Sequence, residues 1–152
     1  GGASKAVCVS LCSSRPRALR IFDIDKKKAR ALIQSLKKVF PEVALEAADS
    51  LADLGIKDCD LLVNATPIGM KESDPLLVKG DSLHKGLFVY DLIYNPARTK
   101  LLAQAQKAGA RTSNGLGMLL YQGALSFKFF TGRAAPLGVM RTALNKGVRR
   151  CC

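Results

Sequence analysis

The sequence has few of the residues that mark metal centres. It contains a single histidine, His84, and no Cys-x-x-Cys pair. A closed zinc site needs four ligands, so Cys8 and Cys12, which stand one helical turn apart, are expected to be buried apolar side chains of a helix. No metal site is predicted. His84 has no partner motif and is expected to be a solvated surface residue rather than a catalytic one.

Acidic and aromatic residues are also scarce. The chain has 12 Asp and Glu residues against 24 Lys and Arg residues, which gives a formal net charge of +12, and its aromatic content is only 6%. Such a charge favours an anionic partner, which could be a nucleic acid, a membrane surface or a phosphorylated small molecule. Nucleic acid ranks last, because aromatic residues are few and no nucleic-acid-reading motif is visible. We therefore expect no nucleic-acid partner.

Long uncharged runs are missing as well. The most apolar segment, Leu116 to Phe130, is interrupted by Lys128 and holds Gln122 near its centre. A segment of this kind is too short to span a membrane and is expected to form a helix buried against other protein. The Gln122 amide should then be paired either to protein or to a substrate hydroxyl. No membrane partner is expected.

The length and the cysteine count limit the organisation of the chain. Its 152 residues, 48% of them apolar, are enough to bury one full core, so a single domain over residues 1–148 is predicted. The five cysteines make an odd count and no signal peptide precedes them, which indicates a cytoplasmic, reducing location. Residues 149–152 are predicted to form a basic tail in which Cys151 and Cys152 are free thiols.

Short β-branched runs alternate with amphipathic helical stretches, which is typical of a parallel α/β sheet of the doubly wound, Rossmann-like class. Asp25 is expected to cap one helix, and Asn95-Pro96 is expected to open another that ends at Gly109. Pro136 is expected to start the last helix. The predicted strands are Ala18–Asp23, Val43–Glu46, Asp60–Asn64, Leu87–Asp91 and Ala110–Thr112.

The N-terminal segment resembles part of a phosphate-binding turn. Gly1, Gly2 and Ala3 lead directly into a helical pattern, as in the second half of a glycine-rich turn that lets backbone amides approach a pyrophosphate. Asp23 follows 21 residues after Gly2, close to the spacing of about 20 expected for a carboxylate that accepts both hydroxyls of an adenosine ribose. The alternatives are a cloning remnant for the two glycines, and a strand-end turn residue or helix cap for Asp23.

Three later segments carry the most specific pattern. Asn64, Ala65, Thr66 and Pro67 lie just past a predicted buried strand, where open α/β sheets bind ligands, and could line the adenosine and nicotinamide riboses. The alternative is an ordinary turn between a strand and a helix. The segments are Asn64-Ala65-Thr66-Pro67-Ile68-Gly69-Met70, Asp91-Leu92-Ile93-Tyr94-Asn95-Pro96 and Asn114-Gly115-Leu116-Gly117-Met118-Leu119-Leu120-Tyr121-Gln122-Gly123-Ala124.

Together these segments resemble the shikimate 5-dehydrogenase family, which includes the quinate/shikimate dehydrogenases, in one register from Gly1 to about Leu144. The resemblance implies hydride transfer between NAD(P) and the ring C–OH of shikimate or 3-dehydroshikimate, or of quinate. Leu92 and Gly115 match cofactor-contacting positions of the family, and the absent Gly115 side chain would let a flat nicotinamide lie against backbone. Met118 would supply an apolar wall beside it.

The resemblance also implies what the chain does not contain. Tyr94 and Gln122 match residues that reach the polyol substrate, whereas the family's proton-transfer and carboxylate-binding residues belong to an N-terminal substrate domain. We therefore predict no catalytic residue here, an incomplete sheet that lacks its first strand, and dependence on an upstream substrate domain or a partner chain. The isolated chain is expected to be inactive and marginally stable. The alternative is a non-catalytic dinucleotide-binding or interaction module derived from the family.

The end of the first predicted strand bears on cofactor choice. Members of the family that use NADP commonly have an Asn-Arg-Thr run there, whereas this chain has Asp23-Ile24-Asp25. A carboxylate repels a 2′-phosphate and Ile24 offers it no donor, so NAD is predicted to be preferred over NADP. The lysines at 26–28 could soften that preference.

Overall fold

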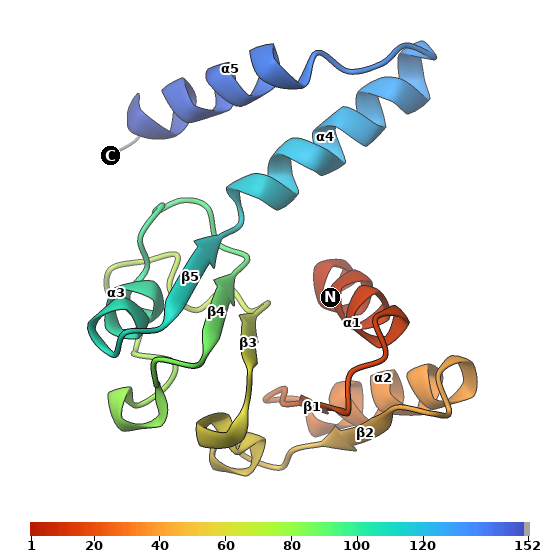
Figure 1. The fold of residues 1–152 in the computed structure, drawn as a ribbon, viewed down its shortest axis with the longest axis vertical. Helices are drawn as coiled ribbons and strands as arrows, with labels where there is room; N and C mark the ends of the chain where they lie inside the picture. Colours follow the sequence, from red (N-terminus) through yellow and green to blue (C-terminus); the bar gives the residue numbers. More distant parts are fainter. Residues whose placement is uncertain (151–152) are drawn as a thin grey trace. The chain divides into compact units, whose positions relative to one another are not determined.

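The computed structural model describes residues 1–150, which fold as two compact units, one of residues 1–58 and one that begins at Cys59 (Figure 1). The single domain over residues 1–148 stays a prediction. Cys151 and Cys152, predicted to be free thiols, lie outside the described residues. A helix that runs to Arg150 includes the first half of the predicted basic tail.

The first unit is a two-stranded parallel sheet with helices. Its main elements are α1 (Gly2–Ser13), β1 (Ala18–Ile21), α2 (Lys26–Val39) and β2 (Ala44–Ala47), followed by the short 3-10 helices η1 (Ala52–Leu54) and η2 (Ile56–Asp58). The Asp25 carboxylate accepts the backbone N–H groups of Lys27 and Lys28, which confirms it as the cap of α2. The strands pair in parallel, with Ile21 opposite Ala47.

Apolar side chains of α1, α2 and β2 form the core of this unit. The buried members are Cys8, Cys12, Ile33, Leu36, Val43 and Leu45. Cys8 and Cys12 are thus apolar core residues, as the sequence predicts. Burial raises the pKa of both thiols, which keeps them protonated at neutral pH.

The second unit contains a three-stranded parallel sheet in the order β3-β4-β5. The strands are β3 (Leu61–Asn64), β4 (Phe88–Asp91) and β5 (Arg111–Asn114), with η3 (Gly80–Ser82) before β4 and α3 (Lys100–Lys107) between β4 and β5. The register places Asn64 opposite Asp91 and Asp91 opposite Asn114. Three polar residues therefore share the carboxyl edge of the sheet. The predicted parallel α/β class is confirmed.

One predicted helix boundary is wrong. Asn95-Pro96 does not open a helix: this peptide bond is cis, and α3 begins at Lys100. Thr99 is the N-cap, and its side chain accepts the backbone N–H of Leu102. A threonine hydroxyl satisfies an unpaired helix N–H, whereas proline at the start of a helix only removes one. The predicted end is confirmed, with Gly109 at a φ of 78° directly after the helix.

Two helices follow the sheet, α4 (Leu116–Thr131) and α5 (Leu137–Arg150). They approach each other at Gly123, where an added Cβ would lie 3.5 Å from Met140 Cε. In the described part of the chain, no helix is long and apolar enough to cross a membrane.

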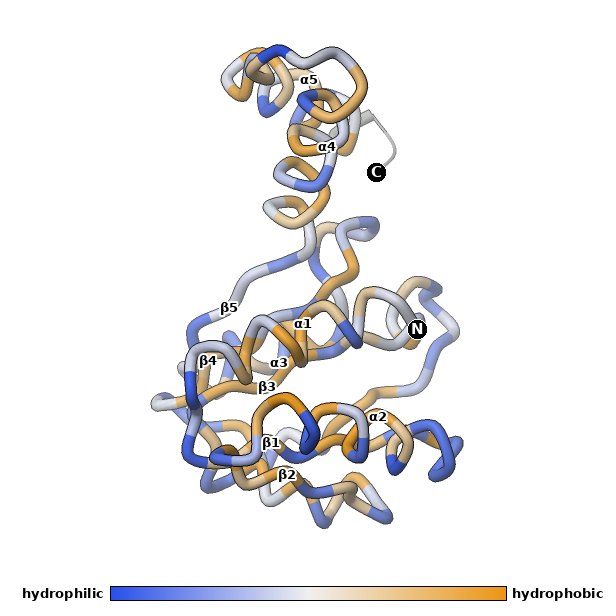
Figure 2. The backbone as a smooth tube through the Cα atoms, turned by 90° about the vertical axis from the view of Figure 1, so that its right-hand side faces the viewer, coloured by the Kyte–Doolittle hydropathy of each residue, from blue (hydrophilic) through white to orange (hydrophobic). Residues whose placement is uncertain are grey.

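The predicted burial of the Leu116 to Phe130 helix is wrong for this chain. Figure 2 shows apolar segments along α4, yet Leu120 is its only buried residue, while Phe129 and Phe130 are 84% and 82% exposed. The apolar composition of α4 exceeds what its contacts with α5 cover. Gln122 is exposed, and its amide donates to Leu119 O at 3.0 Å within the same helix.

Candidate functional site

A buried polar network lies at the carboxyl edge of the second sheet. The buried polar residues among those described are Asn64, Asp91 and Thr99, which are 2%, 0% and 1% exposed. The Asp91 carboxylate accepts hydrogen bonds from Asn64 Nδ2 at 3.0 Å, from Ile93 N at 3.1 Å and from Thr99 Oγ1 at 2.6 Å. Burying a carboxylate is costly unless donors compensate it, and these three donors do so. Asp91 thereby ties together the ends of β3 and β4 and the start of α3.

Asn64 also fixes the loop that follows β3. Its Oδ1 accepts from Thr66 N at 3.0 Å and from Thr66 Oγ1 at 2.8 Å, while its Nδ2 donates to Ile68 O at 3.1 Å. Both ends of the amide are therefore engaged inside the protein. Thr66 and Pro67 are exposed and Ala65 is half-buried, so a ligand would meet the loop at these residues while Asn64 supports them from below.

The far end of this loop is held against α3. The Asp74 carboxylate accepts the N–H groups of Lys71 at 3.0 Å and Gly69 at 2.9 Å, and these bonds lower the pKa of Asp74. Lys100 Nζ in turn donates to the carbonyl oxygens of Glu72 and Asp74. Gly69 has a φ of 110°, a conformation that side chains disfavour. The loop is thus fixed at both ends.

Gly115 lies against the backbone that follows β4. An added Cβ there would stand 1.9 Å from Leu92 O and 2.6 Å from Leu92 C. The sequence predicts that the missing side chain makes room for a nicotinamide, but that space is already filled by Leu92. Gly115 N donates to Ile93 O at 3.1 Å, and Leu92 N donates to Asn64 O at 3.0 Å. The structure thus brings the predicted residues Asn64, Leu92 and Gly115 together, and the cofactor contact of Gly115 stays a prediction.

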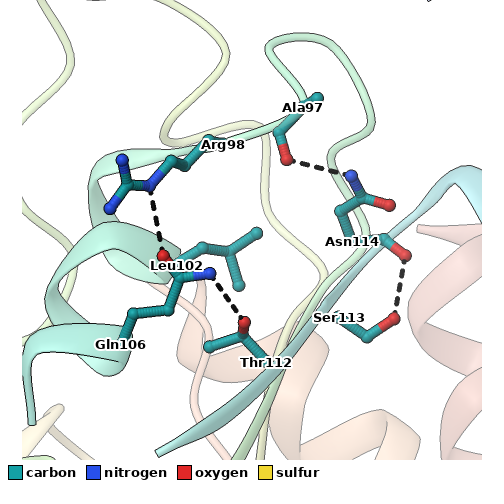
Figure 3. A pocket seen from close by; sticks show the side chains of 7 residues that line it. All are labelled: Ala97, Arg98, Leu102, Gln106, Thr112, Ser113 and Asn114. Carbon is teal, nitrogen blue, oxygen red and sulfur yellow. Dashed lines mark hydrogen bonds between the residues drawn. The ribbon is translucent and has the colours of Figure 1, made fainter. Parts of the chain in front are cut away.

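Asn114 completes this edge. Its Nδ2 donates to Ala97 O at 2.9 Å, and its Oδ1 accepts from Leu116 N at 3.2 Å, next to the start of α4. Figure 3 shows the polar hollow beside it, where Gln106 links Arg98 to Thr112 at 3.2 and 3.1 Å. The hollow is lined by Ala97, Arg98, Leu102, Gln106, Thr112, Ser113 and Asn114.

The remaining predicted residues of this unit are accessible to different degrees. Tyr94 and Gln122 are exposed and Met118 is half-buried. Sequence reasoning did not include Asp91, Thr99 and Asn114 among the site residues. A signal was present for Asp91, which ends a predicted strand as Asn64 does, whereas Asn114 ends β5 only in the structure, because the predicted strand stops at Thr112. Thr99 offered no comparable signal.

His84 departs from its prediction. It is half-buried, and its Nε2 is a buried atom without a hydrogen-bond partner among the described residues. Leu83 and Leu87, which lie on either side of His84 in the sequence, are both buried. Their burial anchors the loop that carries His84 to the rest of the second unit. His84 is therefore not a fully solvated surface residue.

The first unit holds the other predicted positions. Gly1 is the N-cap of α1 and, as a glycine, has no side chain that could cap the helix. An added Cβ at Gly1 or Gly2 would meet nothing within 4 Å. Ala3 is exposed like them. Asp23 Oδ1 accepts the backbone N–H of Asp25 at 2.9 Å. Asp23 thus acts as a strand-end turn residue, and it does so through one of its two carboxylate oxygens, Oδ1.

A shallow hollow lies directly after Asp23. It is lined by Ile24, Asp25, Lys26 and Lys27. Ile24 is 92% exposed. The hollow is open to solvent at the carboxyl end of β1, which is the position expected for an adenosine ribose in a sheet of this class.

Comparison with known proteins shows a similarity to shikimate dehydrogenases. Residues 115–144 match the Shikimate 5'-dehydrogenase C-terminal domain. The chain is 40% identical to a shikimate dehydrogenase (NADP(+)) of Methanobrevibacter smithii, with 96% of this chain and 53% of the relative aligned. For the corresponding protein of Methanopyrus kandleri the identity is 41%, with 98% and 53% aligned.

Solved structures agree with this similarity. A crystal structure of a shikimate dehydrogenase in complex with NADP+ superposes with a TM-score of 0.84 at 36% identity, covering 97% of this chain and 52% of that one. The quinate dehydrogenase from Corynebacterium glutamicum in complex with NAD gives a TM-score of 0.85 at 30% identity, covering 96% and 52%. The chain spans about half the length of the curated relatives it matches. Nearly the whole chain is thus similar to about half of a shikimate dehydrogenase, and residues 115–144 match the C-terminal domain of that family.

Proposed function

We propose that this chain is the cofactor-binding part of a shikimate or quinate dehydrogenase, which transfers hydride between NAD(P) and the ring C–OH of shikimate or 3-dehydroshikimate. The observation that carries the proposal is the loop after β3, which Asn64 and Asp91 hold rigidly at the carboxyl edge of a parallel sheet. The similarity to dehydrogenases solved with NADP+ and with NAD supports it.

Each predicted residue has a role in this proposal. The N–H groups at the start of α1, around Gly1, Gly2 and Ala3, would receive the pyrophosphate. Asp23 would accept ribose hydroxyls through the carboxylate oxygen that the turn leaves unused. Ala65, Thr66 and Pro67 would line a ribose, since the loop presents Thr66 and Pro67 to solvent and leaves Ala65 half-buried beside them.

The reacting end would be shaped by the second unit. Leu92, Gly115 and Met118 would border the nicotinamide, whose chemistry when bound is to accept or give a hydride. Tyr94 and Gln122 would bind substrate hydroxyls, and both are exposed. Gln122 would use its amide oxygen for this purpose, because its Nε2 group donates to Leu119 O.

Within this function we propose that NAD binds more tightly than NADP. Asp23 and the exposed Ile24 occupy the positions at which a 2′-phosphate would need cationic donors. Replacing Asp23 with Asn and Ile24 with Arg should reverse the preference, because one repulsive charge is removed and a bidentate donor is added. Isothermal titration with both cofactors at low salt measures this. Tighter binding of NADP by the unsubstituted chain would contradict it.

We further propose that the 152-residue chain alone does not oxidise shikimate or quinate. Transfer of hydride from the carbon that bears a hydroxyl requires a group that takes the hydroxyl proton, and the Nε2 atom of the only histidine, His84, is buried. A substrate domain, upstream or on a partner chain, would supply that group. Absorbance at 340 nm, followed with each acid and each cofactor, should show no turnover. Turnover that disappears in His84→Ala would contradict this proposal.

The same assay separates the two functional classes. Supplying the N-terminal domain of a relative should restore turnover if the chain is part of an enzyme, because near-attack geometry needs both partners. Cofactor binding without turnover in that mixture would instead indicate a non-catalytic dinucleotide-binding module.

A further inference from the structure

A second acidic residue, Asp49, follows the same edge of the β1-β2 sheet as Asp23. In the parallel pair β1-β2, Ile21 lies opposite Ala47, and Ala48 N donates to Ile21 O at 2.8 Å. Asp23 and Asp49 each follow these paired residues by two positions. Since adjacent strands are about 4.8 Å apart, two acidic residues leave the same edge of this sheet next to each other.

Asp49 holds two cations of α2. Lys26 Nζ and Arg30 Nη2 each lie 3.2 Å from Asp49 Oδ1. Residues four apart share one face of a helix, so both cations are directed to the same carboxylate. Their hydrogen bonds and charges lower the pKa of Asp49, so it is ionised at neutral pH.

The ion pairs involve the residues that could bind a 2′-phosphate. Lys26 lines the hollow that follows Asp23, together with Ile24, Asp25 and Lys27. Of the three lysines at 26–28, Lys26 is paired with Asp49, and Lys28 Nζ lies 3.4 Å from Asp25 Oδ2. Two of the three charges that could attract a phosphate are thereby matched by carboxylates.

We propose that Asp49 is a second determinant of cofactor choice, which disfavours a 2′-phosphorylated dinucleotide by pairing Lys26 and Arg30 and by adding its own negative charge. This inference rests on the proposed function. The effect is moderate in size, because Lys26, Arg30 and Asp49 are more than half exposed and solvent screens such pairs.

The experiment measures the dissociation constants of NAD+ and NADP+ by isothermal titration at low salt, using the full chain and Asp49→Asn. The variant should bind NADP+ roughly fivefold more tightly, which corresponds to one exposed ion pair, while its NAD+ affinity changes less than about twofold. Raising the salt to about 0.5 M should reduce the difference, because the Debye length falls below about 5 Å.

Asp53→Asn is the matched control. It removes the same charge from the same unit, and Asp53 Oδ2 accepts only a hydroxyl hydrogen bond from Ser50, at 2.8 Å, among the contacts described. An equal gain of NADP+ affinity in this control would show a general effect of net charge and overturn the inference. No gain, or a loss, in Asp49→Asn would overturn it as well. Failure of the unsubstituted chain to bind either cofactor would contradict the proposed function itself.

Discussion

Replacing Gly115 with alanine is expected to lower the free energy of unfolding by about 3 kcal/mol or more, because the added methyl would overlap backbone. The new Cβ would stand 1.9 Å from Leu92 O. Leu92 is itself buried, and its N–H is bonded to Asn64 O, so the obstacle is not the end of a flexible side chain. Relief requires that the start of α4 or the end of β4 shift.

The backbone conformation of Gly115 isolates this steric cause. Its φ of −73° is one that any residue adopts, so alanine causes no conformational strain there. Gly117→Ala is the matched control, because Gly117 lies in the first turn of α4, two residues after Gly115, and an added Cβ there would meet nothing within 4 Å. This control should be neutral or stabilising by up to about 1 kcal/mol. Urea denaturation followed by circular dichroism compares the two variants, and equal stabilities would contradict the prediction.

The contrast between the two glycines shows how far sequence reasoning can reach. The sequence marks Gly115 as a special position because it precedes an apolar helix after a short strand. The physical reason lies in Leu92, which is 23 residues away in the chain, and no local pattern predicts that approach. Strands such as β3 and β4 are different, because an apolar run bounded by polar residues is a local signal.

The helices also differ in how far local sequence signals predict them. The helix α2 was predictable because Asp25 and the apolar spacing agree with each other. At α3 the sequence pattern indicated Asn95-Pro96, whereas the N-cap in the structure is Thr99, whose hydroxyl also donates to Asp91. The apolar composition of α4 predicts that other protein covers this helix. Composition alone does not predict whether the covering segment belongs to the same chain. Leu125 and Phe129 are accordingly exposed here.

The buried network was the least predictable part of the site. Asn64 was identified from its place at the end of a predicted strand, and the sequence predicts that it lines a ribose of the bound cofactor. Its amide is instead used by Thr66, Ile68 and Asp91. Of these partners Asp91 is distant in sequence, and such a partner, which helps decide whether a polar residue supports a site or forms its surface, becomes visible only in the fold.

Asp91 should therefore be the polar side chain whose removal costs most. Asp91→Ala would leave Asn64 Nδ2, Ile93 N and Thr99 Oγ1 without their acceptor in a buried place, and each unsatisfied buried donor costs about 1–3 kcal/mol. We expect a loss of unfolding free energy on the order of 3 kcal/mol or more. Because the loop from Asn64 to Ile68 depends on this carboxylate, cofactor affinity should fall with it.

Asp91→Asn separates the contribution of the acceptor from that of the side-chain volume. Asparagine retains the shape and one acceptor oxygen but replaces the other oxygen with a donor, so one of the bonds to Asn64 and Thr99 must be lost or reversed. Its stability should fall between those of Asp91→Ala and the unsubstituted chain. Urea denaturation and cofactor titration, carried out on the same samples, test both effects. A loss below about 1 kcal/mol in Asp91→Ala would contradict the prediction, because this is the net value of a single ordinary hydrogen bond.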